Sequence, residues 1–177
     1  GDATKNDFSV FSKATFKLAE KVTGFIDLQG RFVSYKTNGI NSDLVDFVTD
    51  AYFSFFNPKF GFTYKSSDFN SFYASYGRAN REPNRDDFKA GVTENETLND
   101  IELGWRFTKN KVNINTNLYY MFYQNQLVLT GELDDVGSPI RATSGQSYRL
   151  GLEVDANIQF SKMFNTSTNV AVSSNKN

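Results

Sequence analysis

The chain has 177 residues, the length of one ordinary domain, and its 19 basic and 20 acidic residues give a formal net charge of −1. It contains neither cysteine nor histidine, which excludes disulfides, cysteine nucleophiles, Ser-His-Asp triads and the common zinc sites. A net charge this small gives no overall field to hold nucleic acid. Aromatic residues make up 16% of the chain at a mean hydropathy of −0.48, which excludes disorder and favours aromatic, β-branched strands.

Alternation of apolar and polar residues is the dominant pattern along the chain and predicts about eight strands. The clearest segment is 147–160, where every second residue from Tyr148 to Phe160 is apolar and the residues between are polar or glycine. No stretch has the pattern of an amphipathic helix of any length. In chain order, the expected strands cover about 8–18, 26–32, 56–64, 71–76, 100–107, 111–124, 147–160 and 164–173.

The connections between these strands alternate between short turns and long polar loops. This alternation predicts an antiparallel up-and-down meander, with short turns at one rim and long loops at the other. A Greek-key sandwich would mix the two lengths at both ends. The short turns are expected near 21–23, 66–68, 109–110 and 161–163, and the long loops near 36–50, 80–97 and 126–145.

The alternation fits either a membrane barrel or a soluble barrel with an apolar interior. Aromatic residues near strand ends and charges in mid-strand on the opposite face both favour the membrane barrel. On that interpretation Leu150, Leu152, Val154 and Ile158 face lipid. The charged residues expected to face the lumen are Arg106, Arg149, Glu153 and Asp155, together with Asp27, Arg31 and Glu102. The patterning therefore predicts an all-β fold of about eight strands and leaves the membrane barrel and the soluble barrel both open.

Several of these segments resemble the barrel of TonB-dependent outer-membrane receptors. Residues 57–65 (NPKFGFTYK) and 71–83 (SFYASYGRANREP) are similar to two consecutive strands of that family, the second of which enters an extracellular loop. The resemblance continues through 96–106 (ETLNDIELGWR), 117–127 (NLYYMFYQNQL) and 148–153 (YRLGLE) in the family's order. It covers roughly residues 50–160, which makes it more specific than any single motif.

The resemblance implies that the fold is a partial transmembrane β-barrel. It also implies that residues 1–177 are part of a receptor barrel, without the plug domain, the TonB box and the C-terminal strands. Both ends of the chain are interpreted as cut. Such receptors import ferric chelates or other large nutrients across the outer membrane and are not enzymes. The implied partners are outer-membrane lipid, a chelate or glycan ligand and a TonB-type protein acting through the absent N-terminal regions; no cofactor and no nucleic acid are implied. The isolated piece is expected to have no transport activity and to self-associate through its free edge strands or its apolar faces.

Three arginines near a strand–loop junction, Arg78, Arg81 and Arg85, are candidates for gripping an anionic chelate. The alternative is that Arg78 and Arg81 pair with the neighbouring acids Glu82, Asp86 and Asp87.

Two other patterns have simpler explanations. The carboxylate pairs Asp100–Glu102 and Glu153–Asp155 are interpreted as lumenal charges paired with Arg106 and Arg149, rather than as acid–base catalysts. The acidic segment 132–135 lacks the ligand spacing of an EF-hand and is interpreted as a solvated turn, with no metal bound.

Two further functions remain open on the sequence alone. One is a soluble eight-stranded binding barrel of lipocalin type, with its ligand in an apolar interior. The other is an eight-stranded membrane barrel that acts as an adhesin or structural protein.

Overall fold

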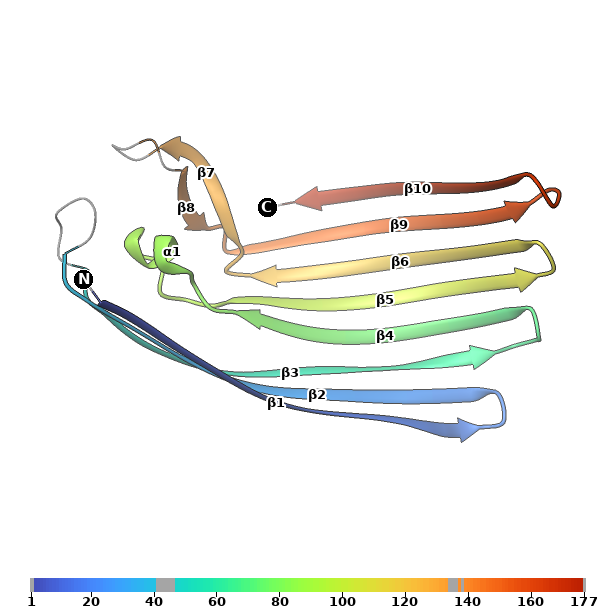
Figure 1. Ribbon diagram of the computed structural model, residues 1–177, viewed down its shortest axis with the longest axis horizontal. Helices are drawn as coiled ribbons and strands as arrows, with labels where there is room; N and C mark the ends of the chain where they lie inside the picture. Colours follow the sequence, from blue (N-terminus) through green and yellow to red (C-terminus); the bar gives the residue numbers. More distant parts are fainter. Residues whose placement is uncertain (1, 41–46, 134–136, 138, 177) are drawn as a thin grey trace.

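The computed structural model describes residues 2–40, 47–133, 137 and 139–176. Within these residues there are ten strands and one short helix (Figure 1). The elements are β1 (Asp2–Ala19), β2 (Val22–Asn38), β3 (Thr49–Lys65), β4 (Asn70–Arg81), α1 (Arg85–Lys89), β5 (Glu96–Lys109), β6 (Val112–Gln124), β7 (Leu127–Leu133), β8 (Pro139–Thr143), β9 (Gln146–Gln159) and β10 (Asn165–Lys176).

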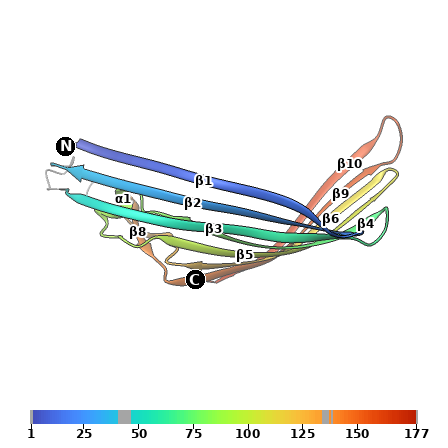
Figure 2. The same cartoon turned by 90° about the horizontal axis from the view of Figure 1, so that it is seen from below.

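Eight strands form one antiparallel sheet in the order β1-β2-β3-β4-β5-β6-β9-β10, with β1 and β10 at its edges. The predicted meander is confirmed, and short turns and long connections lie at opposite ends of the sheet (Figure 1). Figure 2 shows that the sheet is twisted and curved, so that β1–β3 and β9–β10 run at an angle to one another.

The structure differs from the sequence prediction in one connection. Residues 126–145 are predicted to be a long polar loop, but β7 and β8 form a separate two-stranded hairpin there. The apolar run Leu127-Val128-Leu129 does not alternate with polar residues and is too short to predict a strand. Of the acidic segment 132–135, residues Asp134 and Asp135 lie outside the described residues.

The strands of the main sheet are long, from 12 residues in β4 and β10 to 18 residues in β1. Globular strands are usually about five or six residues long, whereas a tilted strand needs about nine to eleven to cross a bilayer. Strand β1 begins at Asp2 rather than near Phe8, because its polar first residues pair with the end of β2. Across the described residues, no helix is long and apolar enough to span a membrane.

Cross-strand pairing gives the sheet one polar and one apolar face. Residues directly opposite each other in antiparallel strands point to the same side. On the polar face, Asn115 lies opposite both Arg106 and Asp155. On the apolar face, Leu118 lies opposite both Leu103 and Leu152, and these three leucines are 43–49% exposed. Among the described residues, none forms a protein core against the apolar face, which disfavours the soluble barrel with an apolar interior.

Three glycines of the polar face lie directly beneath aromatic rings. Each is the cross-strand partner of that ring: Gly61 of Phe25, Gly104 of Tyr73 and Gly151 of Tyr119. A Cβ atom at any of the three would collide with the ring that covers it. Glycine is therefore required at these positions for the rings to lie against the sheet.

Candidate ligand-facing site at the loop end of the polar face

Glu82, the first residue after β4, is the centre of an ion-pair network at the loop end of the polar face. Its carboxylate accepts hydrogen bonds from Lys5 Nζ of β1 at 2.7 Å and from Arg31 Nη1 and Nη2 of β2 at 2.9 Å each. Arg31 also donates through Nε to Asp7 Oδ1 at 3.0 Å. The Glu82 side chain is only 7% exposed. The network therefore attaches the start of the β4–β5 loop to two strands that are distant in the sequence.

The protonation of Glu82 follows from this environment. Burial alone would raise the pKa of its carboxyl group, but the hydrogen bonds and charges of Lys5 and Arg31 outweigh that effect. The pKa of Glu82 is therefore below its ordinary value. The carboxylate is ionised at neutral pH, as a double ion pair requires.

The rest of the loop is ordered by α1 and by one phenylalanine. Asn84 caps the helix: its Oδ1 accepts from the backbone N–H groups of Asp86 and Asp87 at 2.9 Å each, and its own N–H donates to Asp87 Oδ2 at 2.9 Å. Phe88 then stacks on Tyr35 of β2, with ring centroids 5.3 Å apart and planes at 5°. It also packs near Phe53 of β3 at 6.4 Å. The loop thus folds back over the polar face of β2 and β3.

The second long connection is held in a similar way. Glu96 Oε2, at the start of β5, accepts from the backbone N–H of Leu127 at 2.9 Å and from Arg81 Nη2 at 3.2 Å. Ser147 donates its hydroxyl to Gln126 Oε1, and Ser147 is buried. The β7–β8 hairpin is therefore attached to the ends of β5 and β9.

The structure separates the three arginines that the sequence singles out. Arg81 lies on the polar face and pairs with Glu96, rather than with Glu82 or the acids of α1. Arg85 is the first residue of α1 and is exposed. Arg78 is exposed on the opposite, apolar face of β4. Only Arg81 and Arg85 lie beside the loop that covers the polar face.

The mid-strand charges Arg106, Arg149, Glu153 and Asp155 all lie on the polar face. Their contacts differ from those expected, because the arginines lie over aromatic rings: Arg106 over Tyr73 at 4.4 Å from the ring centroid and Arg149 over Tyr123 at 5.2 Å. Asp155 accepts from Asn169 Nδ2 at 2.7 Å. In the described part of the chain these four residues form no ion pair with one another.

Sequence reasoning missed Lys5 and Phe88, and it considered Glu82 only as a partner of Arg78 and Arg81, not of Lys5 and Arg31. The Lys5–Glu82 contact joins residues 77 positions apart, and no local pattern marks it. A partial signal was available, because Asn84 followed three residues later by Asp87 is a capping-box pattern that predicts a helix start.

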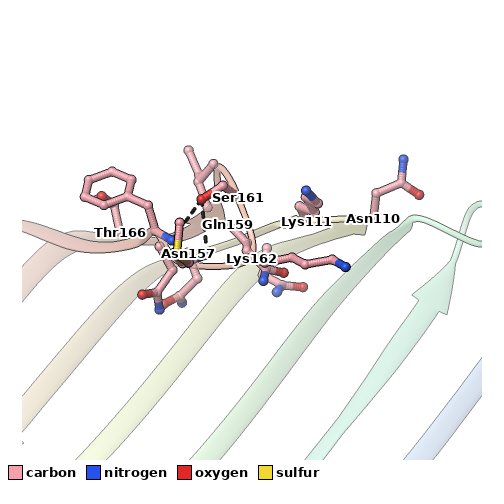
Figure 3. Close-up of a pocket in the computed structure, with 12 residues that line it drawn as sticks. Asn110, Lys111, Asn157, Gln159, Ser161, Lys162 and Thr166 are labelled. Atoms are coloured by element: carbon pink, nitrogen blue, oxygen red, sulfur yellow. Dashed lines mark hydrogen bonds between the residues drawn. The ribbon is translucent and has the colours of Figure 1, made fainter.

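A hollow at the short-turn end is less suited to binding. It lies between the turns that join β5 to β6 and β9 to β10, and its lining includes Asn110, Lys111, Ser161 and Lys162 (Figure 3). These four residues are exposed. Ser161 is occupied within its own turn, where Oγ accepts from the N–H groups of Met163 and Phe164. No cluster of acidic side chains suited to a metal ion occurs among the described residues.

Comparison with known proteins extends these findings. A family model described as "TonB dependent receptor-like, beta-barrel" matches residues 1–177. Among curated proteins, none matches the chain by sequence.

Solved structures with the same fold include two transporters and a receptor. The FrpB iron transporter from Neisseria meningitidis matches with a TM-score of 0.74 at 19% identity, over 98% of this chain and 26% of that one. The copper transporter OprC matches with a TM-score of 0.81 at 17% identity, over 99% and 31%. The siderophore receptor PiuA from Acinetobacter baumannii matches with a TM-score of 0.74 at 17% identity, over 98% and 26%. The chain thus spans between about a quarter and a third of these structures.

Proposed function

Because the chain belongs to the TonB-dependent receptor-like β-barrel family, we propose that its sheet is part of the wall of a receptor that takes up ferric chelates or other large nutrients. Barrels of this family are outer-membrane proteins of Gram-negative bacteria, and the chain is placed in that membrane. The family comprises transporters and receptors, so we propose no catalytic role. A barrel segment of this kind would transport nothing by itself.

The observation that carries this proposal is the difference between the two faces of one sheet. The apolar face exposes large side chains such as Leu152 and Ile101 at 46–47%, and within the described part of the chain nothing packs over them. An exposed apolar surface of this extent is unusual for a protein in water and ordinary for a barrel in lipid. We therefore assign the apolar face to lipid and the polar face, with Arg106, Arg149, Glu153 and Asp155, to the lumen.

The loop end would then be the ligand-facing end. The β4–β5 loop, fixed by Glu82 and Phe88, forms an ordered surface over the polar face. Arg81 and Arg85 are our candidates for contacting an anionic chelate there, because a guanidinium binds carboxylate or catecholate oxygens with two parallel hydrogen bonds. The energy source of such a receptor would be a TonB-type partner, bound by regions outside this chain.

Cysteine labelling in the complete receptor tests the assignment of faces. Single cysteines replace Leu152 and its neighbour Glu153, and cells are treated with a lipid-restricted thiol reagent and then with a small water-soluble one. We expect the lipid reagent to label position 152 and the water-soluble reagent to label position 153. Preferential lipid labelling at 153 would reverse the faces and with them the proposed function.

Matched charge insertions give a second test of the faces. Leu152→Arg should destabilise the membrane-embedded barrel by about 2–4 kcal/mol if it lies near the bilayer midplane. Glu153→Arg, one residue along the same strand, should cost much less because its side chain would enter water. The measurement is the urea midpoint of the folded receptor in lipid vesicles. Equal losses for the two variants would contradict the assignment.

A further inference from the structure

Arg78 lies on the face of β4 that carries Phe72, Ala74 and Tyr76, and its side chain is exposed. Its direct cross-strand partner is Asn99 of β5. Arg81 and its partner Glu96 point to the opposite face. Arg78 is therefore a cation on the apolar side of the sheet, where a lumenal ligand would not meet it.

Cross-strand register places Arg78 at the border of the apolar band. A row here means residues of neighbouring strands that lie directly opposite one another. On the face of Arg78, the next row toward the middle of the sheet is aromatic and aliphatic, and the next row toward the loops is polar. The inner row is Tyr76, Ile101, Tyr120 and Leu150; the outer row is Asn80, Thr97, Gln124 and Gln146. The Arg78 row itself contains Asn99, Phe122, Tyr148 and Lys176. Aromatic and basic residues at such a border are typical of a membrane interface.

Within the ranges that the structure describes, no acidic side chain lies beside Arg78 on this face. Its neighbours there are Tyr76 and Asn80 on β4 and Asn99 on β5, and among the described residues Arg78 takes part in no ion pair. Lys36 offers a contrast, because it lies on the same face but pairs with Asp50 at 3.2 Å and sits over the Tyr52 ring. The described residues thus supply no anion to the guanidinium of Arg78.

A neighbouring amide is available to share an anion with Arg78. The hydroxyl group of Tyr76 donates to Asn99 Oδ1 at 2.7 Å, which fixes the orientation of the Asn99 amide. The amide N–H groups of Asn99 remain donors next to a guanidinium that offers two parallel N–H donors. Together they present several donors and no acceptor to the interface, which suits a tetrahedral phosphate.

We propose that Arg78, with Asn99 positioned by Tyr76, binds the phosphate group of an outer-leaflet lipid at the border of the apolar band. This site rests on the proposed function, because it requires the apolar face to lie in lipid with the long loops outward. On this proposal Arg78 contacts lipid at the membrane surface, whereas Arg81 and Arg85 remain the candidates for contacting a ligand in the lumen.

The test uses the complete receptor, purified in neutral detergent and titrated with dioleoyl phosphatidic acid, with dioleoylglycerol as the lipid that lacks only the phosphate. Binding is counted by native mass spectrometry for wild type, Arg78→Gln, Arg78→Lys and the control Lys36→Gln. We expect wild type to prefer the phosphate lipid and Arg78→Gln to bind it about fivefold more weakly. Arg78→Lys should keep most of the preference, and Lys36→Gln should match wild type.

The following results would contradict the proposal. Equal binding by Arg78→Gln and wild type would overturn it, as would an equal loss in Lys36→Gln. Displacement of the lipid by millimolar inorganic phosphate would assign Arg78 to a soluble anion instead. A cysteine replacing Leu152 in the Arg78→Gln variant separates this test from that of the proposed function. If the apolar face lies in lipid, the lipid-restricted reagent still labels position 152 after the phosphate site is lost. If position 152 is not labelled, the proposed function fails as well.

Discussion

The two ends of the main sheet are held together by different kinds of contact. At the short-turn end, two turns use the same local arrangement: Ser67 Oγ accepts from the N–H groups of Phe69 and Asn70, and Ser161 Oγ accepts from those of Met163 and Phe164. At the loop end, Glu82 and Phe88 reach residues of β1, β2 and β3. The turn end is therefore encoded within a few residues, whereas the loop end depends on strands that must already be assembled.

The largest expected effect is at the loop end. Phe88→Ala removes a buried ring stacked on Tyr35 and should lower the free energy of local opening of residues 82–95 by about 3 kcal/mol. Hydrogen exchange of the Val92 amide, which bonds to Asp87 O, measures it. Met163→Ala is the matched control at the turn end, because Met163 is 97% exposed. If the two changes had similar effects, the contrast between the ends would be lost.

Breaking the ion-pair network should come next in size. Glu82→Gln leaves Lys5 without a charged partner and Arg31 with Asp7 alone, and should weaken the attachment of the loop by about 2 kcal/mol. The rate of limited proteolysis within residues 82–95 reports this change. Glu20→Gln, in the exposed turn between β1 and β2, should leave cleavage at wild-type rates. An unchanged rate in Glu82→Gln would mean that Phe88 alone holds the loop.

Acid should weaken the same attachment without a mutation. Because the pKa of Glu82 is lowered in the folded loop, its contribution is complete above the ordinary glutamate pKa of about 4.3. The contribution declines as pH falls below that value and is lost once pH is below the lowered pKa. Exchange of the Val92 amide, corrected for intrinsic rates, should therefore accelerate between pH 5 and pH 3, taken as approximate bounds, in wild type but not in Glu82→Gln.

The smallest expected effect is at the turn end. Ser161→Ala removes two hydrogen bonds within an exposed turn and should cost about 0.5 kcal/mol, without changing exchange in residues 82–95. Ser67→Ala should behave alike because its geometry is the same. Urea unfolding of the receptor in lipid vesicles checks both. A loss several times larger would show that the turns also support distant parts of the sheet.

The comparison between the ends also explains what the sequence predicted. Alternation from Tyr148 to Phe160 reflects the two faces of one strand, a property of neighbouring residues, so the eight main strands and their faces were predictable. The extension of β1 back to Asp2 was not, because those polar residues are strand only through pairing with β2.

The candidate site was less predictable than the sheet. The arginines Arg78 and Arg81 are three residues apart in one strand. An odd spacing places them on opposite faces, so they cannot form one cluster. The role of Glu82 depends on Lys5 and Arg31, which no local pattern connects to it. Contacts across strands, rather than residue type, decide which charges meet.

The rings that lie over glycines also determine how much room the polar face leaves in front of it. Tyr73, Tyr119 and Phe25 would each project inward if their cross-strand neighbours had side chains, but each lies against a bare stretch of backbone instead. Tyr73 is further held down by its hydrogen bond to Asn117 Oδ1 at 2.9 Å and by Arg106 above it. These three rings therefore add less to the thickness of the sheet than rings that project from it. On the proposed assignment of this face to the lumen, a bulky ligand would contact these rings and the Arg106 side chain above Tyr73.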